Sequence, residues 1–343
     1  MTGSLHHSRP DARRTVAVLG ATGRVGREML AILDQRGFPC GRLRALASAR
    51  SAGRTLTFRG AEVVVEDVAT ADLEGIDIAL FSAGGSTSRE WAPRFSDAGA
   101  VVVDNSSAWR MDPQVPLVVP EVNADALQPP LRIIANPNCS TIQLVVVLSG
   151  LEEGWGLERV VVSTYQSVSG AGEKGVREYR AQRDDGSVEA PVMGQVVHEN
   201  VVPWIGPLAE LGYTEEEIKV ERESRKIMRL PALRVTCTAV RVPVMVAHGE
   251  SVNVQLSRPA TLEEVRRRID GLPGVQVLDD PEVRRFPMPL QVAGEDDVFV
   301  GRIRPDPSAP NAWNLWVVGD NLRKGAALNA VQIAEVLVAR ELG

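Results

Sequence analysis

A glycine-rich turn near the start of the chain constrains its fold more than any other feature. The segment Gly20-Ala21-Thr22-Gly23-Arg24-Val25-Gly26 follows a short β-branched run at 15–19 and precedes a helical pattern at 24–36. Glycines at this spacing permit a tight turn and a close approach of phosphate, while the helix N-terminus offers free N–H groups. Such glycines can serve packing alone, but the position after the first strand favours a dinucleotide-binding fold. The cofactor contacts predicted here are Gly20, Thr22, Gly23, Arg24, Val25 and Gly26.

Apolar runs along the chain predict two domains of different architecture. From 15 to 138, short apolar runs alternate with helical segments, which is typical of a parallel sheet covered on both faces. From 139 to 321, longer strand-like runs predict an α+β domain with a mixed or antiparallel sheet. The first set of strands is expected at 15–19, 43–47, 62–66, 76–81, 101–103 and 131–135, and the second at 159–165, 234–245 and 251–257. Helices are expected at 142–148, 215–228, 261–272 and 324–342.

The two ends of the chain differ in pattern. Residues 1–14 carry polar side chains and no apolar core, so we expect a disordered extension there. The segment 324–342 has helical periodicity, and we expect it to pack back onto the first domain. The first domain would then comprise 15–138 and 322–343, and the second 139–321.

Composition narrows the class of protein. A length of 343 residues suggests two domains, and a net charge of -6 argues weakly against a nucleic-acid-binding surface. No apolar run approaches the roughly 20 residues that a membrane helix needs. The three cysteines, Cys40, Cys139 and Cys237, lack the spacing of a disulfide framework or a zinc site. A reducing compartment, the cytoplasm, is therefore expected, with no metal and no membrane partner.

The segment after the second expected strand bears on the choice of cofactor. An NAD-preferring site would place an acidic residue about twenty residues beyond the glycine turn. This chain has Ser48-Ala49-Arg50-Ser51 instead, and hydroxyls with a guanidinium suit a 2′-phosphate, which favours NADP. Arg50 could also be a solvated surface charge. At the end of the strand 76–81, backbone at Ala83 and Gly84 could line the same cleft.

A cysteine stands where a strand gives way to a helix. In Asn136-Pro137-Asn138-Cys139-Ser140-Thr141, Cys139 would face the unpaired N–H groups and positive dipole of the helix 142–148. Both favour the thiolate, which is the nucleophilic form. A buried structural cysteine is the alternative, because free cysteine is among the most buried residue types.

Taken together, these motifs resemble the aspartate-β-semialdehyde dehydrogenase family from residue 15 to the end. The resemblance rests on the segments 20–26, 48–53, 104–110, 116–123, 136–141, 166–172, 223–227, 241–252 and 319–332. It implies a glyceraldehyde-3-phosphate dehydrogenase-like fold: a Rossmann-type domain and an α+β catalytic and dimerisation domain. It also implies NADPH-dependent reduction of β-aspartyl phosphate to aspartate semialdehyde with release of phosphate, in lysine, threonine and methionine biosynthesis. Members of the family are homodimers or homotetramers.

The resemblance also assigns roles to single residues. Cys139 would form a thioester, Gln166 would orient the acyl group, and His248 would act as acid and base near neutral pH. Arg110 and Lys226 would hold the phosphate, while Arg241 and Glu223 would hold the substrate carboxylate and ammonium groups. Further cofactor contacts would come from Ser48, Arg50, Ser51, Ser169, Gly170 and Asn321.

Some of these roles can be weighed against a plainer alternative from the residues alone. Glu223 and Lys226 lie three residues apart on one helix face and could form a solvated salt bridge. Arg241 lies in an apolar strand, where a charge usually needs a partner, so a ligand role is physically reasonable.

Two other functions remain open at this point. N-acetyl-glutamyl-phosphate reductases share the fold and chemistry, but their cysteine tends to follow His-Pro-Gly, unlike Asn136-Pro137-Asn138 here. A cofactor-sensing protein without catalysis would be expected to have lost some of Cys139, Gln166, Arg241 and His248.

Overall fold

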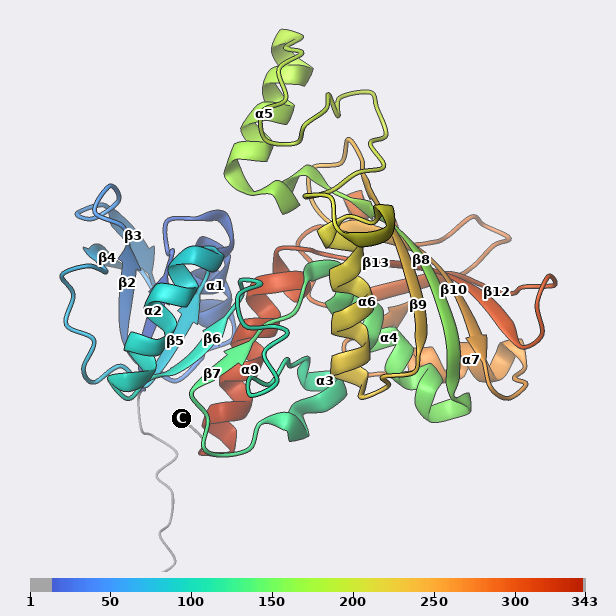
Figure 1. Ribbon diagram of the computed structural model, residues 1–343, viewed down its shortest axis with the longest axis horizontal. Helices are drawn as coiled ribbons and strands as arrows, with labels where there is room; N and C mark the ends of the chain where they lie inside the picture. Colours follow the sequence, from blue (N-terminus) through green and yellow to red (C-terminus); the bar gives the residue numbers. More distant parts are fainter. Residues whose placement is uncertain (1–13, 342–343) are drawn as a thin grey trace, which may run out of the picture.

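The computed structural model describes residues 14–341 and divides them between two β-sheets with helices around each (Figure 1). The extension expected over 1–14 lies outside the described residues, apart from Arg14, which is already the first residue of strand β1. No helix within 14–341 combines the length and the apolar character needed to cross a membrane.

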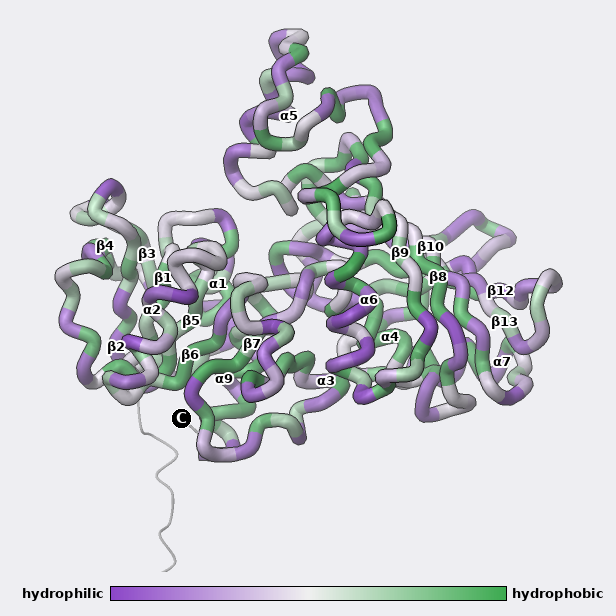
Figure 2. Tube along the Cα trace, in the orientation of Figure 1, coloured by the Kyte–Doolittle hydropathy of each residue, from purple (hydrophilic) through white to green (hydrophobic). Residues whose placement is uncertain are grey.

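The first domain is built on a seven-stranded sheet in the order β3-β4-β2-β1-β5-β6-β7. All neighbouring strands run parallel except β3 and β4, which are antiparallel. The strands are β1 (Arg14–Leu19), β2 (Cys40–Ala47), β3 (Thr55–Phe58), β4 (Ala61–Asp67), β5 (Ile78–Phe81), β6 (Val101–Asp104) and β7 (Ile133–Ala135). The central strands are buried and appear as hydrophobic tube at the left of Figure 2, which confirms the expected Rossmann-type sheet.

Helices cover both faces of this sheet. They are α1 (Arg24–Gln35), α2 (Gly85–Asp97) and α9 (Leu328–Ala339), while the short α3 (Pro120–Asn123) contacts α4, α6 and α9. The α9 helix, red in Figure 1, follows a π-helical turn at 323–327 and packs against α1, β5 and β6. The end of the described chain therefore belongs to the core of the first domain, where Leu328, Val331 and Leu337 are buried.

The second domain is built on a six-stranded mixed sheet in the order β11-β12-β13-β10-β8-β9. Its strands are β8 (Leu157–Gln166), β9 (Arg234–Arg241), β10 (His248–Leu256), β11 (Val275–Val277), β12 (Val298–Pro305) and β13 (Ala312–Gly319). β8–β9 and β11–β12 are parallel pairs, and the others are antiparallel, so the expected mixed sheet is confirmed.

Helices α4 (Cys139–Trp155), α6 (Glu215–Met228) and α7 (Leu262–Asp270) contact this sheet, and the short α8 (Pro289–Val292) contacts β13. Thr214 and Thr261 cap α6 and α7 through capping boxes, which explains why both helix starts could be recognised in the sequence. The α4 helix is buried from 140 to 148 and continues to Trp155, beyond the expected end at 148.

An arm projects from the second domain at the top of Figure 1. It consists of helix α5 (Gly172–Asp185) and the irregular segment 186–209. Neither α5 nor α2 was expected from the sequence, because α5 is rich in charged residues and the apolar face of α2 is short, with Trp91, Ala92 and Phe95 only. The small apolar cluster that supports the arm includes Val168, Val176 and Tyr179.

Candidate active site

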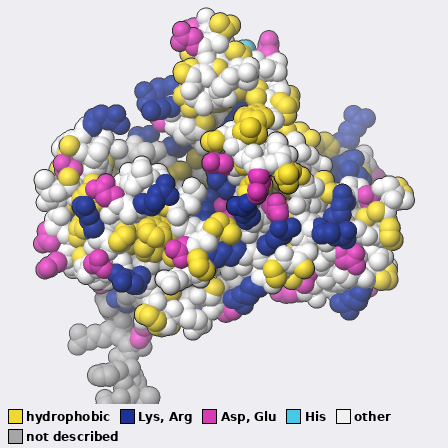
Figure 3. Space-filling model, viewed as in Figure 1, with side chains coloured by type: hydrophobic (Ala, Val, Ile, Leu, Met, Phe, Trp, Pro, Cys, Tyr) yellow, Lys and Arg dark blue, Asp and Glu magenta, His cyan; other side chains and the backbone are white. Residues whose placement is uncertain are grey.

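A cavity of about 480 Å³ lies where the two domains meet, and it joins the glycine turn to the start of α4. Lys and Arg side chains gather around the hollow between the domains in Figure 3. The first domain contributes Gly23, Arg24, Val25, Ser82, Asn105, Ser107 and Arg110. From the other elements come Cys139, Gln166, Ser169, Gly170, Glu173, Glu216, Lys219, Arg241 and Asn321.

Cys139 is the first residue of α4, which begins three residues before the helix start expected at 142. The preceding Asn138 caps the helix, since its Oδ1 accepts hydrogen bonds from the backbone N–H of Ser140 and Thr141 at 3.0 and 3.3 Å. Gly325, in the π-helical turn before α9, also lies against Cys139. If residue 325 carried a Cβ, that atom would lie 3.0 Å from the Cys139 Cβ. Glycine at 325 therefore lets the π-helical turn pack against Cys139 without this tight contact.

The structure corrects the expectation that the Cys139 thiol is ionised. Burial, followed by the nearby Glu216 carboxylate, raises the pKa of Cys139 to about 12, and Arg110 and Arg241 oppose this only partly. The helix N-terminus does favour the thiolate, but desolvation of the charge outweighs it. Cys139 is therefore a thiol at neutral pH in this structure.

Glu216 is the centre of a polar cluster beside Cys139. Its Oε1 accepts hydrogen bonds from Asn138 Nδ2 at 2.8 Å and from Gln166 Nε2 at 3.3 Å. Its Oε2 lies 3.4 Å from Lys219 Nζ. Gln166 also donates to Ser140 Oγ at 2.9 Å, so the predicted glutamine lies within this cluster. Asn138, Glu216 and Lys219 were missed by the sequence analysis.

Glu223 and Lys226, which we expected to bind substrate, have structural partners instead. Glu223 is 1% exposed, lies 3.0 Å from Arg110 Nη1, and accepts a 2.6 Å hydrogen bond from the Asn138 backbone N–H. Lys226 Nζ donates to three backbone carbonyls, those of Arg110, Asp112 and Val115, at 2.7–2.9 Å. With its donors engaged in this way, Lys226 is not positioned to hold a phosphate.

The same spacing occurs one heptad earlier in α6, at Glu216 and Lys219. Seven residues are nearly two helical turns, so both pairs lie on the same helix face. Only the earlier pair lines the cavity with Cys139. The sequence carries no signal that separates the two pairs, because the turn of α6 that faces the cavity is set by how the helix packs in the fold.

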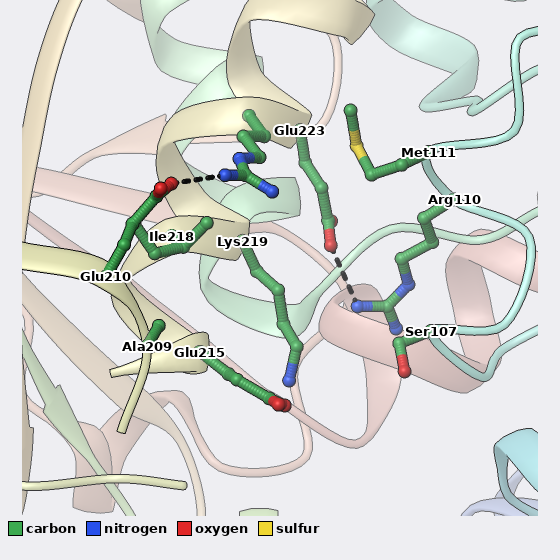
Figure 4. Close-up of a pocket in the computed structure, with 10 residues that line it drawn as sticks. Ser107, Arg110, Met111, Ala209, Glu210, Glu215, Ile218, Lys219 and Glu223 are labelled. Atoms are coloured by element: carbon green, nitrogen blue, oxygen red, sulfur yellow. Dashed lines mark hydrogen bonds and ion pairs between the residues drawn. The ribbon is translucent and has the colours of Figure 1, made fainter. Parts of the chain in front are cut away.

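Arg110 lines the cavity but is firmly held. Its Nε donates to Asn136 O at 2.9 Å, its Nη2 donates to Asn105 O at 3.0 Å, and its Nη1 pairs with Glu223. A second cavity, of about 500 Å³, lies against the same guanidinium and Lys219. Figure 4 shows this second cavity, with the Arg110–Glu223 ion pair on one wall and Lys219 on another. The phosphate-binding role expected for Arg110 remains compatible with this placement.

Arg241, at the end of β9, has no carboxylate within ion-pair distance among the described residues. Its Nη1 donates to Ser167 O at 2.6 Å, and its guanidinium lines the cavity. Burial lowers the pKa of Arg241 below its usual value. A buried cation without a fixed counter-ion is suited to an anionic ligand.

His248 lies behind Gly170 rather than on the cavity wall. A Cβ at Gly170 would lie 3.1 Å from Arg241 Nη1 and 3.4 Å from His248 Nε2, so glycine lets both side chains approach the loop. His248 Nδ1 accepts a 3.0 Å hydrogen bond from the Ser167 backbone N–H, which leaves the ring proton on Nε2. Burial and then the Arg241 charge lower the pKa of His248 to about 3. The expectation that this imidazole titrates near neutrality is therefore wrong for this structure.

Ser169 and Asn321 form a buried hydrogen-bonded group beside His248. Asn321 Oδ1 accepts from Ser169 Oγ at 3.2 Å and from the Ala247 N–H at 2.9 Å, and both residues reach the cavity. The structure thus brings Ser169, Gly170 and Asn321 to the same wall.

The carboxyl ends of β1, β2 and β5 lie side by side because these strands are parallel neighbours. The glycine turn follows β1 and needs its glycines: a Cβ at Gly20 would lie 2.4 Å from Ser82 O, and one at Gly26 would lie 2.2 Å from Gly20 O. Such a close-packed turn at a helix start fits a dinucleotide phosphate.

The remaining predicted cofactor residues lie along the same edge. Thr22 Oγ1 is 3.4 Å from Ser51 Oγ, which joins the glycine turn to the segment after β2. Ser48 and Arg50 are exposed, Ala83 is half-buried, and Gly84 has a φ of 85° at the start of α2. None of these four lines the cavity that contains Cys139.

These features define a two-domain protein in which a Rossmann-type sheet and a cysteine at a helix start share one cleft. Residues 15–129 match the family model for the semialdehyde dehydrogenase NAD-binding domain, and 148–324 match that for the semialdehyde dehydrogenase dimerisation domain. The chain belongs to the aspartate-semialdehyde dehydrogenase family.

Several relatives are similar over nearly their whole length. The aspartate-semialdehyde dehydrogenase of Aquifex aeolicus is 50% identical over 95% of this chain and 98% of its own length. That of Bacillus subtilis is 48% identical over 94% and 96%, respectively. A crystal structure of Vibrio cholerae aspartate semialdehyde dehydrogenase II complexed with ASA has a TM-score of 0.92 at 45% identity, and covers 95% of this chain and 98% of its own. The Candida albicans enzyme with NADP has a TM-score of 0.76 at 25% identity, covering 97% and 100%.

Proposed function

We propose that this protein is an aspartate-semialdehyde dehydrogenase that reduces β-aspartyl phosphate to aspartate semialdehyde and releases phosphate, with NADPH as reductant. The reaction would serve lysine, threonine and methionine biosynthesis. The observation that carries the proposal is the single cleft that contains Cys139, Glu216, Lys219 and Arg241 beside the glycine turn. The relatives' names support the choice of substrate.

The charged groups of the cleft match the charged groups of an aspartyl phosphate. Arg241, which has no fixed counter-ion, would bind the α-carboxylate. Glu216 would bind the α-ammonium group, and Lys219 with Arg110 would bind the phosphate. In this arrangement, Glu216 and Lys219 take the roles that we expected for Glu223 and Lys226, which lie about two helical turns later in α6. A substrate with an acetylated amine would leave the Glu216 carboxylate without an ammonium partner.

Cys139 would attack the acyl carbon and form a thioester, while the C–O bond to phosphate breaks and the departing phosphate takes up the thiol proton. Loss of the thiol proton requires that the pKa of about 12 falls, and a position closer to Arg110 or Arg241 would lower it. At the start of α4 the N–H groups of Ser140 and Thr141 already donate to Asn138 Oδ1, so the Cys139 N–H is the donor that would stabilise negative charge on the carbonyl oxygen. Gln166 would orient the acyl group from the side of Ser140.

When bound, the nicotinamide supplies the hydride that reduces the thioester. Backbone at Gly23, Arg24 and Val25 would hold the phosphates, and Ser169, Gly170 and Asn321 lie on the wall where the nicotinamide would approach Cys139. His248 is neutral and carries its ring proton on Nε2 behind Gly170, so it would support the Gly170 loop at the cavity wall rather than exchange a proton near pH 7.

NADP would be preferred over NAD. Ser48, Arg50 and Ser51 follow β2 at the sheet edge beside the glycine turn, where the adenosine ribose of a dinucleotide lies. The exposed Arg50 guanidinium is free to pair with a 2′-phosphate.

A homodimer would form through the second domain. The match to a dimerisation domain supports this. So does the side of the sheet opposite α4, where Tyr165 is 36% exposed and packs against Trp316 with tilted rings, 5.5 Å between centroids.

The test is a steady-state assay of aspartate semialdehyde plus phosphate with NADP and then with NAD. We expect phosphate-dependent reduction of NADP, a lower kcat/KM with NAD, and no activity in Cys139→Ala. Activity with N-acetyl-glutamate semialdehyde but not with aspartate semialdehyde would transfer the assignment to the reductase of the acetylated substrate. Phosphate-dependent oxidation by Cys139→Ala would rule out the thioester route.

A further inference from the structure

The first turns of α1 and α5 meet across the cleft through an ion pair. Arg24 is the first residue of α1, and its Nη2 lies 3.1 Å from Oε2 of Glu173 in the first turn of α5. Both residues line the cavity that contains Cys139. The ion pair therefore joins the glycine turn of the first domain to the arm of the second.

One carboxylate serves several cations at this point. Besides Arg24, the Glu173 carboxylate lies 4.0 Å from Arg27 Nη2 and 3.9 Å from Arg177 Nε. The N-terminus of α1 adds the positive end of a helix dipole, and no acidic residue in the first turn of α1 offsets it. In the first turn of α5, the acidic residue is Glu173. Arg24 Nε is buried and has no hydrogen-bond partner within residues 14–341. Positive charge thus exceeds what Glu173 alone neutralises.

We propose that Glu173 is the internal counter-ion of the dinucleotide phosphate site, and that it competes with the cofactor phosphates for Arg24. This inference rests on the dinucleotide placement proposed above. The phosphates would bind at the start of α1, where Gly23, Arg24 and Val25 line the cleft. Glu173 and the phosphates would both draw on the same guanidinium, so we expect binding to shift Arg24 from one anionic partner towards the other.

Competition by Glu173 should weaken the binding of the cofactor. Glu173 places a negative charge beside the binding site of a polyanion, which weakens cofactor binding by repulsion and by holding Arg24 away. The Glu173 side chain is 35% exposed and that of Arg24 is 24% exposed. An ion pair with this exposure changes an equilibrium by about two- to fivefold. Neutralising Glu173 should therefore tighten binding of the dinucleotide by about that factor.

The experiment measures the Kd of NADP⁺ and of NAD⁺ for the full chain by titration calorimetry. We expect Glu173→Gln to lower the Kd of the better-bound dinucleotide, and the gain to shrink at high salt. Arg24→Gln should raise the Kd, and adding Glu173→Gln to that variant should recover less than it gains in the parent protein. Asp185→Asn is the matched control, because it removes the same charge from the exposed far end of α5 and should leave the Kd unchanged.

The outcomes separate this inference from the proposed function. If the parent protein binds neither dinucleotide, the proposed cofactor site is wrong and the competition is wrong with it. If the parent binds but Glu173→Gln has the same Kd as Asp185→Asn, or binds more weakly, only the competition is overturned. If Glu173→Gln lowers the Kd by the same factor with and without Arg24, Glu173 acts only as a general repulsive charge. The proposed exchange at Arg24 is then overturned.

Discussion

The two glutamates on one face of α6 should respond in opposite ways to the same substitution. Glu223 is 1% exposed and pairs with Arg110, whose side chain is 9% exposed. Removing one partner of a buried ion pair costs about 3–5 kcal/mol, because the other charge remains buried without compensation. Glu223→Gln keeps the shape and one hydrogen bond, so we expect the lower end, about 3 kcal/mol. At 2–4 °C per kcal/mol, Tm should fall by roughly 6–12 °C.

Glu216→Gln should leave Tm nearly unchanged and act on chemistry. Its contacts with Asn138 and Gln166 are hydrogen bonds that an amide can largely reproduce. Losing a charge-assisted bond to the substrate ammonium costs about 1.5–3 kcal/mol, which is a roughly 10- to 150-fold loss in kcat/KM. The carboxylate also raises the pKa of Cys139, so its removal should lower that pKa and speed alkylation of the thiol at pH 8.

Three measurements on both variants test these opposite roles of Glu223 and Glu216. They are thermal unfolding, steady-state kinetics and the rate of iodoacetamide alkylation as a function of pH. The reasoning fails if Glu223→Gln retains the parent Tm and loses substrate binding while Glu216→Gln remains fully active. It also fails if Glu216→Gln does not move the alkylation profile to lower pH.

Three further predictions follow from the same site. Lys219→Ala should raise the KM for phosphate in the oxidation direction with little change in Tm, and steady-state kinetics with an unchanged KM would contradict this. Lys226→Ala should lower Tm, measured by thermal unfolding, because it leaves three backbone carbonyls without their donor. His248 has a folded-state pKa of about 3, below its unfolded value, so stability should fall as pH drops from about 6.5 towards 3. Denaturant unfolding across that range should show a smaller loss in His248→Gln than in the parent.

Much of the fold could be predicted because the relevant signals are local. The glycine turn depends on contacts within a few residues and with the residue after β5, and its glycines are required because a Cβ at Gly20 or Gly26 would lie 2.2–2.4 Å from a backbone oxygen. The α6 helix runs over Glu215–Met228, as expected, because its capping box stands next to it in sequence. By contrast, α5 is a polar helix with few apolar residues, and the periodic pattern of α2 is limited to Trp91, Ala92 and Phe95, so the sequence analysis predicted neither helix.

The site was predicted less well because its chemistry depends on distant parts of the chain. Cys139 could be found from its motif. Arg241 could be found from the unusual position of a charge within an apolar strand. The choice between Glu216 and Glu223 could not be made from spacing, since both lie on the same face of α6. The pKa of Cys139 depends on burial and on Glu216, which is brought close only by the packing of α6 against α4.

The central claim is that Cys139 carries the acyl group. The most direct measurement mixes the protein with aspartate semialdehyde and NADP⁺ without phosphate, quenches it with acid, and maps the adduct by mass spectrometry. We expect an aspartyl thioester on the peptide that contains Cys139, and its loss when phosphate is added before the quench. An adduct on Cys40 or Cys237, or turnover with no thioester on any cysteine, would contradict the claim.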